Sequence, residues 1–147
     1  MITLLIVLWI TAFIPGFNYY DYRTTRNGGK PEYILYFIIK GFLAIIHGTF
    51  MLMANQDSKT DYSFLSAWEL TVVAAPYFLF QITSFWVIYE LIRNGWTRKQ
   101  WDYYDHKEKD SGYIDMFFAW AGRPFHLFAK LCAIVVCILS IIVIYKR

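Results

Sequence analysis

The sequence contains four long apolar segments separated by polar stretches, and these segments constrain the fold more than any other feature. They cover residues 2–20, 33–54, 67–92 and 125–145. A helix needs about 20 mostly apolar residues to cross the hydrocarbon core of a bilayer, and the segments meet that length. Only 17% of the residues are charged, fewer than the roughly 25% of a soluble domain. The sequence therefore predicts an all-α integral membrane bundle of four transmembrane helices in a single domain.

The first segment lacks the leading basic residues and the small-residue cleavage site of a signal peptide, so we interpret it as an uncleaved anchor. Pro15 and Gly16 are expected to kink or fray its end. A polar loop over 21–32 is predicted to follow, because an asparagine and two glycines in a row are typical of a turn.

The longest polar stretch, residues 93–112, mixes charged and aromatic side chains and opens the predicted interfacial region 93–124 ahead of the last span. Tryptophan is enriched where a membrane meets water, so Trp96 and Trp101 are predicted to contact lipid headgroups. A single helix from residue 113 to residue 145 would be roughly 50 Å long, which is too long for one ordinary span. We therefore predict a short interfacial helix over 113–121 and a break or helix start within three residues of Pro124.

Basic residues predict the orientation. The loops 21–32 and 93–112 together carry eight lysines and arginines, whereas the remaining polar loop and the C-terminal tail carry three. The positive-inside rule places the two basic loops on the cytoplasmic side and both termini on the opposite side. The expected location is a cytoplasmic or organelle inner membrane, and a virion membrane remains an alternative.

Five ionisable residues in the predicted spans form a candidate polar network inside the membrane, where an unpaired charge costs about 3 kcal/mol at the bilayer centre. They are Lys40, His47, Glu69, Glu90 and Lys130. Depth along the spans favours a pair between Glu90 and one of Lys40, Lys130 and Arg123. It also favours a pair between His47 and Glu69. Two interpretations remain open, a proton or ion relay and a structural pairing of helices. Close packing of the face that carries His47 is also predicted by its small neighbours Gly41, Ala44 and Gly48.

A basic stripe begins the last span, since Arg123, His126 and Lys130 fall within about 60° of arc on a helix. The guanidinium of Arg123 is expected at the membrane surface, on a lipid phosphate or on Asp115. The ammonium of Lys130 is expected to pair with a carboxylate, Glu90 first, or to reach the headgroups. His126 would assist by hydrogen bonding. Anionic lipids are therefore expected partners.

No cofactor or metal is predicted. A b-type haem held by His47 and His126 is a further alternative, but axial ligation needs two imidazoles at one depth, and these start at different depths. The charges around His106 alternate in sign, as in a solvated loop, rather than forming a metal site. Cys132 and Cys137 lie five residues apart in one predicted helix, too far apart to bridge.

The stretch "RTTRNGGKPEY" resembles a segment of the membrane-associated eicosanoid and glutathione metabolism proteins, which also have four spans. Arg26, Asn27 and Glu32 carry the resemblance, with five residues from Asn to Glu where that family usually has three. The resemblance implies an enzyme that activates a thiolate on a lipid-like substrate.

Two functions lead from these observations. The first is a structural or accessory subunit of a homo-oligomer or of a larger membrane complex. The second is a small ion or proton channel or transporter. An enzyme is less favoured, because the sequence carries no nucleophile elbow, phosphate-binding glycine loop, CxxC or HExxH motif. Nucleic-acid binding is not expected, because no block of lysine and arginine is long enough.

Overall fold

The computed structural model describes residues 1–26, 33–55, 65–96, 117–118 and 120–146, and every regular element in these ranges is a helix. Three consecutive elements form one continuous N-terminal helix. They are α1 (Ile2–Leu8), the π-helical turn η1 (Trp9–Phe13) and α2 (Ile14–Arg26). The others are α3 (Tyr33–Ala54), α4 (Ala67–Trp96) and α6 (Arg123–Lys146).

The N-terminal helix continues through Pro15, where a kinked or frayed end was expected. Proline lacks an N–H, and in a regular α-helix its ring would meet the carbonyl of Thr11. The wider η1 turn lies directly before this point, and such turns re-route the backbone hydrogen bonds of a helix. The helix therefore continues past Pro15 as far as Arg26. The prediction that residues 21–26 form a loop is wrong.

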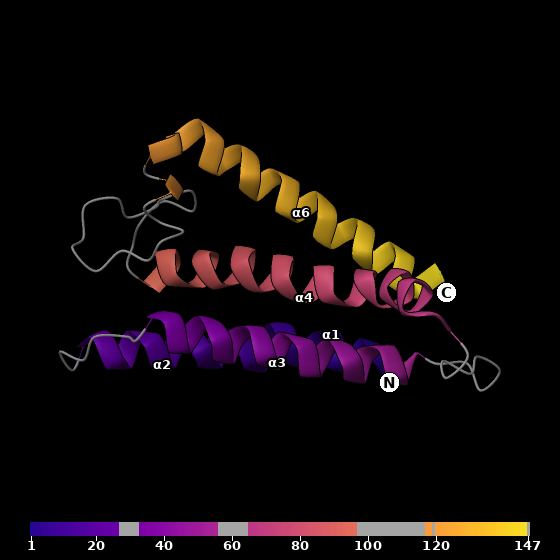
Figure 1. Cartoon of the computed structure of the whole chain (residues 1–147). Helices are drawn as coiled ribbons and strands as arrows, with labels where there is room; N and C mark the ends of the chain where they lie inside the picture. The colour runs from indigo at the N-terminus through magenta and orange to yellow at the C-terminus, as the bar shows by residue number, and fades with distance from the viewer. Residues whose placement is uncertain (27–32, 56–64, 97–116, 119, 147) are drawn as a thin grey trace.

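The helices run alternately up and down, so both chain termini lie at one end of the bundle (Figure 1). The hydroxyls of Thr3 and Tyr145 are 2.9 Å apart and join the two terminal helices there. At the same end, the Nδ2 group of Asn55 donates to the hydroxyl of Tyr77 at 2.7 Å and to the carbonyl of Ile144 at 3.0 Å. One side chain that follows α3 is thus bonded to both α4 and α6.

Helix α4 lies at the centre of the arrangement. It packs against α6 on one side and against α3 and the N-terminal helix on the other. Figure 1 shows α6 converging on α4 toward the C-terminus. The apolar residues buried most completely come from these contacts: Trp9, Ile14, Met51, Phe80 and Ile144.

Within the described residues, three helical segments are long and apolar enough to cross a membrane. They are Ile2–Thr24, Ala67–Trp96 and Arg123–Lys146. The apolar part of α3 is the shorter stretch Ile38–Ala54. By length and composition the chain is a multi-pass membrane protein. Large apolar side chains on the outer surface, such as Phe42 and Phe128, suit contact with lipid.

The last span begins next to Pro124, as the sequence predicts. Gly122 has a φ of +87°, in the left-handed region that favours glycine, and its N–H bonds to the carbonyl of Phe118 at 2.8 Å. Helix α6 then starts at Arg123, so the prediction of a helix start within three residues of Pro124 is confirmed. The expected interfacial helix lies largely outside the described residues, although 117–118 and 120–121 are helical.

Candidate functional site

The expected ion pair between α4 and α6 is present. The Nζ atom of Lys130 lies 2.6 Å from Oε2 of Glu90, and the indole N–H of Trp86 donates to Oε1 of the same carboxylate at 2.6 Å. The Nε2 atom of His126 lies 3.5 Å from Oε2. Helical spacing explains the convergence, because residues four apart lie on one face and each helix supplies such a pair.

Aromatic rings enclose this ion pair. The imidazole of His126 is 1% exposed and meets the ring of Phe118 edge-on at 4.8 Å. The rings of Trp86 and Phe118 stack at 5.5 Å. The side chain of Lys130 is only 4% exposed, so its ammonium is neutralised inside the protein rather than at the headgroups. Breaking such a pair on one side leaves an uncompensated buried charge.

Lys40 pairs with a carboxylate that the sequence did not indicate. Its Nζ atom lies 2.9 Å from Oδ2 of Asp21, and the hydroxyl of Tyr89 donates to the same oxygen. The ammonium also sits 4.4 Å from the centre of the Tyr89 ring, a cation–π distance. Asn18 completes the group by donating to the backbone carbonyl of Tyr89 at 2.8 Å. Of the three partners expected for Glu90, the structure therefore pairs Lys130 with it and places Lys40 beside Asp21.

Two consecutive residues of α4 therefore serve two different groups. Tyr89 bonds toward the N-terminal helix and α3, whereas Glu90 bonds toward α6. We call the first group the Asp21 cluster (Asn18, Asp21, Lys40, Tyr89) and the second the Glu90 cluster (Trp86, Glu90, His126, Lys130). Adjacent helical positions point about 100° apart, which lets one turn of α4 join both sides of the bundle.

His47 lies among aromatic rings beside the π-helical turn. Its imidazole is 7% exposed and stacks on Trp9 at 4.8 Å, with Phe13 at 5.7 Å. Neither ring nitrogen has a hydrogen-bond partner among the described residues, and the Oε1 atom of Gln81 also lacks one. By contrast, the indole N–H of Trp9 donates to the hydroxyl of Ser84 at 3.1 Å. Three polar atoms are thus buried in this layer without the bonds that normally offset burial.

Glu69 does not pair with His47, and that expectation is wrong. Its Oε2 atom accepts hydrogen bonds from the N–H and hydroxyl of Ser66, at 2.9 and 2.7 Å. The N–H of Glu69 in turn donates to the Ser66 hydroxyl at 3.3 Å. This reciprocal pattern is a capping box at the start of α4. The sequence "SAWE" carries that signal, a serine followed three residues later by a glutamate.

The remaining candidates are dispersed. His47 contacts Trp9 and Phe13, whereas His126 contacts Phe118 and Trp86, so the structure does not bring these two histidines together. Arg123 is exposed at the start of α6, and Trp96 is 47% exposed at the end of α4. Trp101, His106 and Asp115 lie outside the described residues. In the described part of the chain, Cys132 and Cys137 are free thiols, and no group of three or more His, Cys, Asp or Glu side chains could hold a metal.

Comparison of the chain with protein families, curated proteins and solved structures finds no match. Arg26, Asn27 and Glu32, which carry the resemblance to the eicosanoid and glutathione metabolism proteins, lie outside the described side chains, so what that resemblance implies stays a prediction.

Replacing His47 by phenylalanine is expected to stabilise the fold by about 1 kcal/mol, because it removes two unsatisfied buried nitrogens and keeps a ring against Trp9. Thermal unfolding of the purified protein in detergent measures the change. Ser84→Ala is the matched control in the same layer, and it should destabilise by a similar amount, because it leaves the Trp9 N–H without its acceptor. A His47→Phe protein that melts lower than the wild type would contradict the prediction.

Proposed function

We propose that the chain is a four-span structural or accessory subunit of a membrane assembly, either of its own copies or of a larger complex. The observation that carries the proposal is the internal pairing of its membrane-embedded charges. Glu90 is paired with Lys130, and Asp21 with Lys40, across helix contacts. A conduction path needs such groups to converge around water, whereas a packing element needs them neutralised against neighbouring helices.

Unoccupied surface supports the assembly part of the proposal. Helix α6 packs on α4 along one face, and its other face presents large apolar residues. Examples are Phe128, Val135 and Leu139, each more than half exposed. Such a face is available to a neighbouring subunit as well as to lipid.

Mass and composition in mild detergent test this function. The chain should elute as a defined oligomer or with a stoichiometric partner, and light scattering combined with mass spectrometry distinguishes the two. The double variant Glu90→Gln/Lys130→Met should assemble in the same way, because no charge remains to neutralise. A monomer that carries a proton or ion current in liposomes, and loses that current in the double variant, would contradict the proposal.

One observation favours the second candidate, a small proton channel or transporter. His47 is a titratable group buried without hydrogen-bond partners among the described residues, and it packs against a π-helical turn. Such turns occur frequently at functional sites. His47→Phe separates the candidates, because a subunit tolerates the change, whereas a proton path through this imidazole loses its flux.

We also propose that the segments 21–32 and 93–112, which include the ends of α2 and α4, lie on the cytoplasmic side, with both termini opposite. The excess of basic residues in these segments supports this orientation. Single cysteines at positions 27, 59 and 105, in a background with both native cysteines replaced by serine, test it by labelling of sealed vesicles. We expect positions 27 and 105 to react from one side and position 59 from the other. Labelling of 27 and 59 from the same side would exclude four alternating spans.

A further inference from the structure

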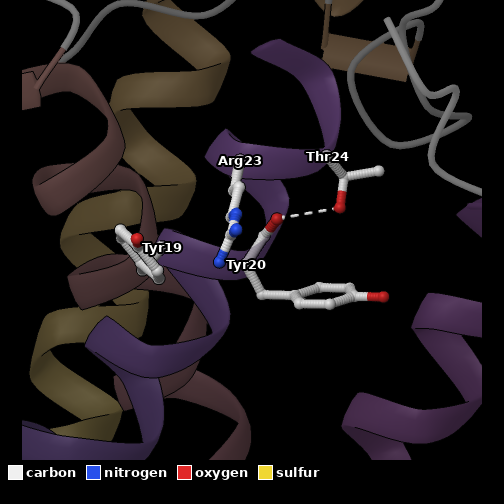
Figure 2. Close-up of a pocket in the computed structure, with 4 residues that line it drawn as sticks. All are labelled: Tyr19, Tyr20, Arg23 and Thr24. Atoms are coloured by element: carbon white, nitrogen blue, oxygen red, sulfur yellow. Dashed lines mark hydrogen bonds between the residues drawn. The ribbon is translucent and has the colours of Figure 1, made fainter. Parts of the chain in front are cut away.

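The outer face of α2 carries a hollow of about 280 Å³ lined by Tyr19, Tyr20, Arg23 and Thr24. In Figure 2 the Arg23 side chain extends between the two tyrosine side chains. Both tyrosines are more than half exposed, so the hollow opens outward rather than into the bundle. Arg23 follows Tyr20 by three residues and Tyr19 by four, and residues at these spacings are neighbours on a helix surface.

The hollow has a net positive charge. Among the described residues Arg23 forms no ion pair. The carboxylate nearest in sequence, Asp21, is directed to Lys40 and Tyr89 in the Asp21 cluster. The hydroxyl of Thr24 donates to the carbonyl of Tyr20 at 2.9 Å, which leaves the guanidinium as the cationic donor of the hollow. An anion is therefore the complementary ligand.

The position along the helix indicates which anion. The apolar segment Ile2–Thr24 ends at the hollow, so Arg23 lies where the segment would leave the hydrocarbon. Tyr22 contacts the ring of Trp96 at 6.1 Å at the same level. Tyrosine and tryptophan gather at the headgroup level of membranes, and arginine there binds phosphate with two parallel hydrogen bonds.

Open surface lies one helical turn before the hollow, at Gly16. Gly16 is exposed and precedes Tyr19 and Tyr20 by three and four residues, so it occupies the same face one turn deeper. A side chain built at Gly16 would meet no atom within 4 Å, which means that the surface there is open. This open surface leaves room for a hydrocarbon chain.

We propose that Arg23, Tyr19 and Tyr20 bind the phosphodiester of an anionic membrane phospholipid, with one acyl chain over Gly16. The guanidinium holds the phosphate oxygens, and the tyrosine rings border the glycerol region. The site requires only that the chain lies in a membrane, and it is independent of the role as a subunit. It also adds residues that the sequence did not indicate for headgroup contact.

Native mass spectrometry of the full-length protein tests the site, with phosphatidylglycerol and phosphatidylcholine as the added lipids. Arg23→Gln is expected to lower phosphatidylglycerol affinity by about tenfold, the loss of a charge-assisted contact. Lys146→Gln is the matched control, an exposed cation at the opposite end of the bundle, and it should bind as the wild type does. Arg23→Lys should give an intermediate loss, because lysine keeps the charge but not the paired hydrogen bonds.

Two further arms separate a lipid from a free phosphate. Gly16→Leu should weaken phosphatidylglycerol binding by filling the acyl-chain path, and inorganic phosphate should not displace the lipid. An unchanged Arg23→Gln protein would overturn the proposal, as would equal losses in Arg23→Gln and Lys146→Gln. Displacement by inorganic phosphate, with no effect of Gly16→Leu, would assign the hollow to a soluble anion instead.

Discussion

Replacing Lys130 by methionine is expected to destabilise the bundle by about 3–5 kcal/mol, the loss typical when one partner of a buried ion pair is removed. The ammonium lies 2.6 Å from Glu90, and its own side chain is 4% exposed. Methionine fills a similar volume, so the loss comes from the carboxylate left behind and not from a cavity. Unfolding of the purified protein, followed by circular dichroism in detergent, gives the change in apparent melting temperature.

The double variant Glu90→Gln/Lys130→Met distinguishes the charge effect from a packing effect. With both charges gone, most of the lost stability should return, because glutamine can still accept the Trp86 N–H that now bonds to Glu90. Lys146→Met on the same helix is the control for a lost positive charge and should change stability by less than about 0.5 kcal/mol. The interpretation would fail if Lys130→Met were as stable as this control.

Replacing Gly48 by leucine is expected to force α3 and α4 apart and to cost about 1–3 kcal/mol or more. A Cβ atom at this position would already lie 2.7 Å from Cδ1 and 2.9 Å from Cε1 of Phe78, closer than real side chains allow. A leucine adds further atoms in the same direction. The melting temperature in detergent and the fraction of protein recovered as folded material both report the effect.

Gly41→Leu is the matched control, because Gly41 lies two turns away on the same helix and a Cβ there meets nothing within 4 Å. Its substitution should be neutral or stabilising by up to about 1 kcal/mol, since glycine is a poor helix former. If both variants lose stability equally, the glycines act through helix propensity and not through the contact with α4.

The helices themselves were largely predictable, because the length of an apolar run and a proline or glycine boundary are local signals. The range 33–54 matches α3, and the start of α6 at Arg123 follows from Pro124. The predicted helix boundary at Pro15 was wrong because the surrounding backbone adapts to the proline. Pro15 suggested a helix end, but the preceding η1 turn absorbs it and the helix continues to Arg26.

That single boundary explains the main omission in the candidate site. Because Asp21 is assigned to a loop in the sequence analysis, it is not expected as an ion-pair partner inside the bundle. Lys40 is therefore expected to pair with Glu90 instead. Glu69 failed for another reason, since its closest donor is Ser66 in its own helix start. The pair of Glu90 and Lys130 was predictable because both depth and helix order favour it.

Packing of the face around His47 was only partly predictable. Small residues indicate that a neighbour can approach, but they do not say at which turn it does. Ala44 is buried and Gly48 contacts α4, whereas Gly41 faces open space. The spatial offset between α3 and α4 decides this, and it depends on contacts along the whole of both helices.

The position of Tyr89 beside Glu90 has a consequence for how the sequence can diverge. The Asp21 cluster and the Glu90 cluster meet different neighbours, so a substitution in one should be nearly additive with a substitution in the other. Lineages could therefore exchange or lose one ion pair without a compensating change in the other. Asn55 imposes the opposite constraint, because it bonds to Tyr77 and Ile144 at once. A substitution of Asn55 should therefore be accompanied in evolution by substitutions in the parts of α4 and α6 that it contacts.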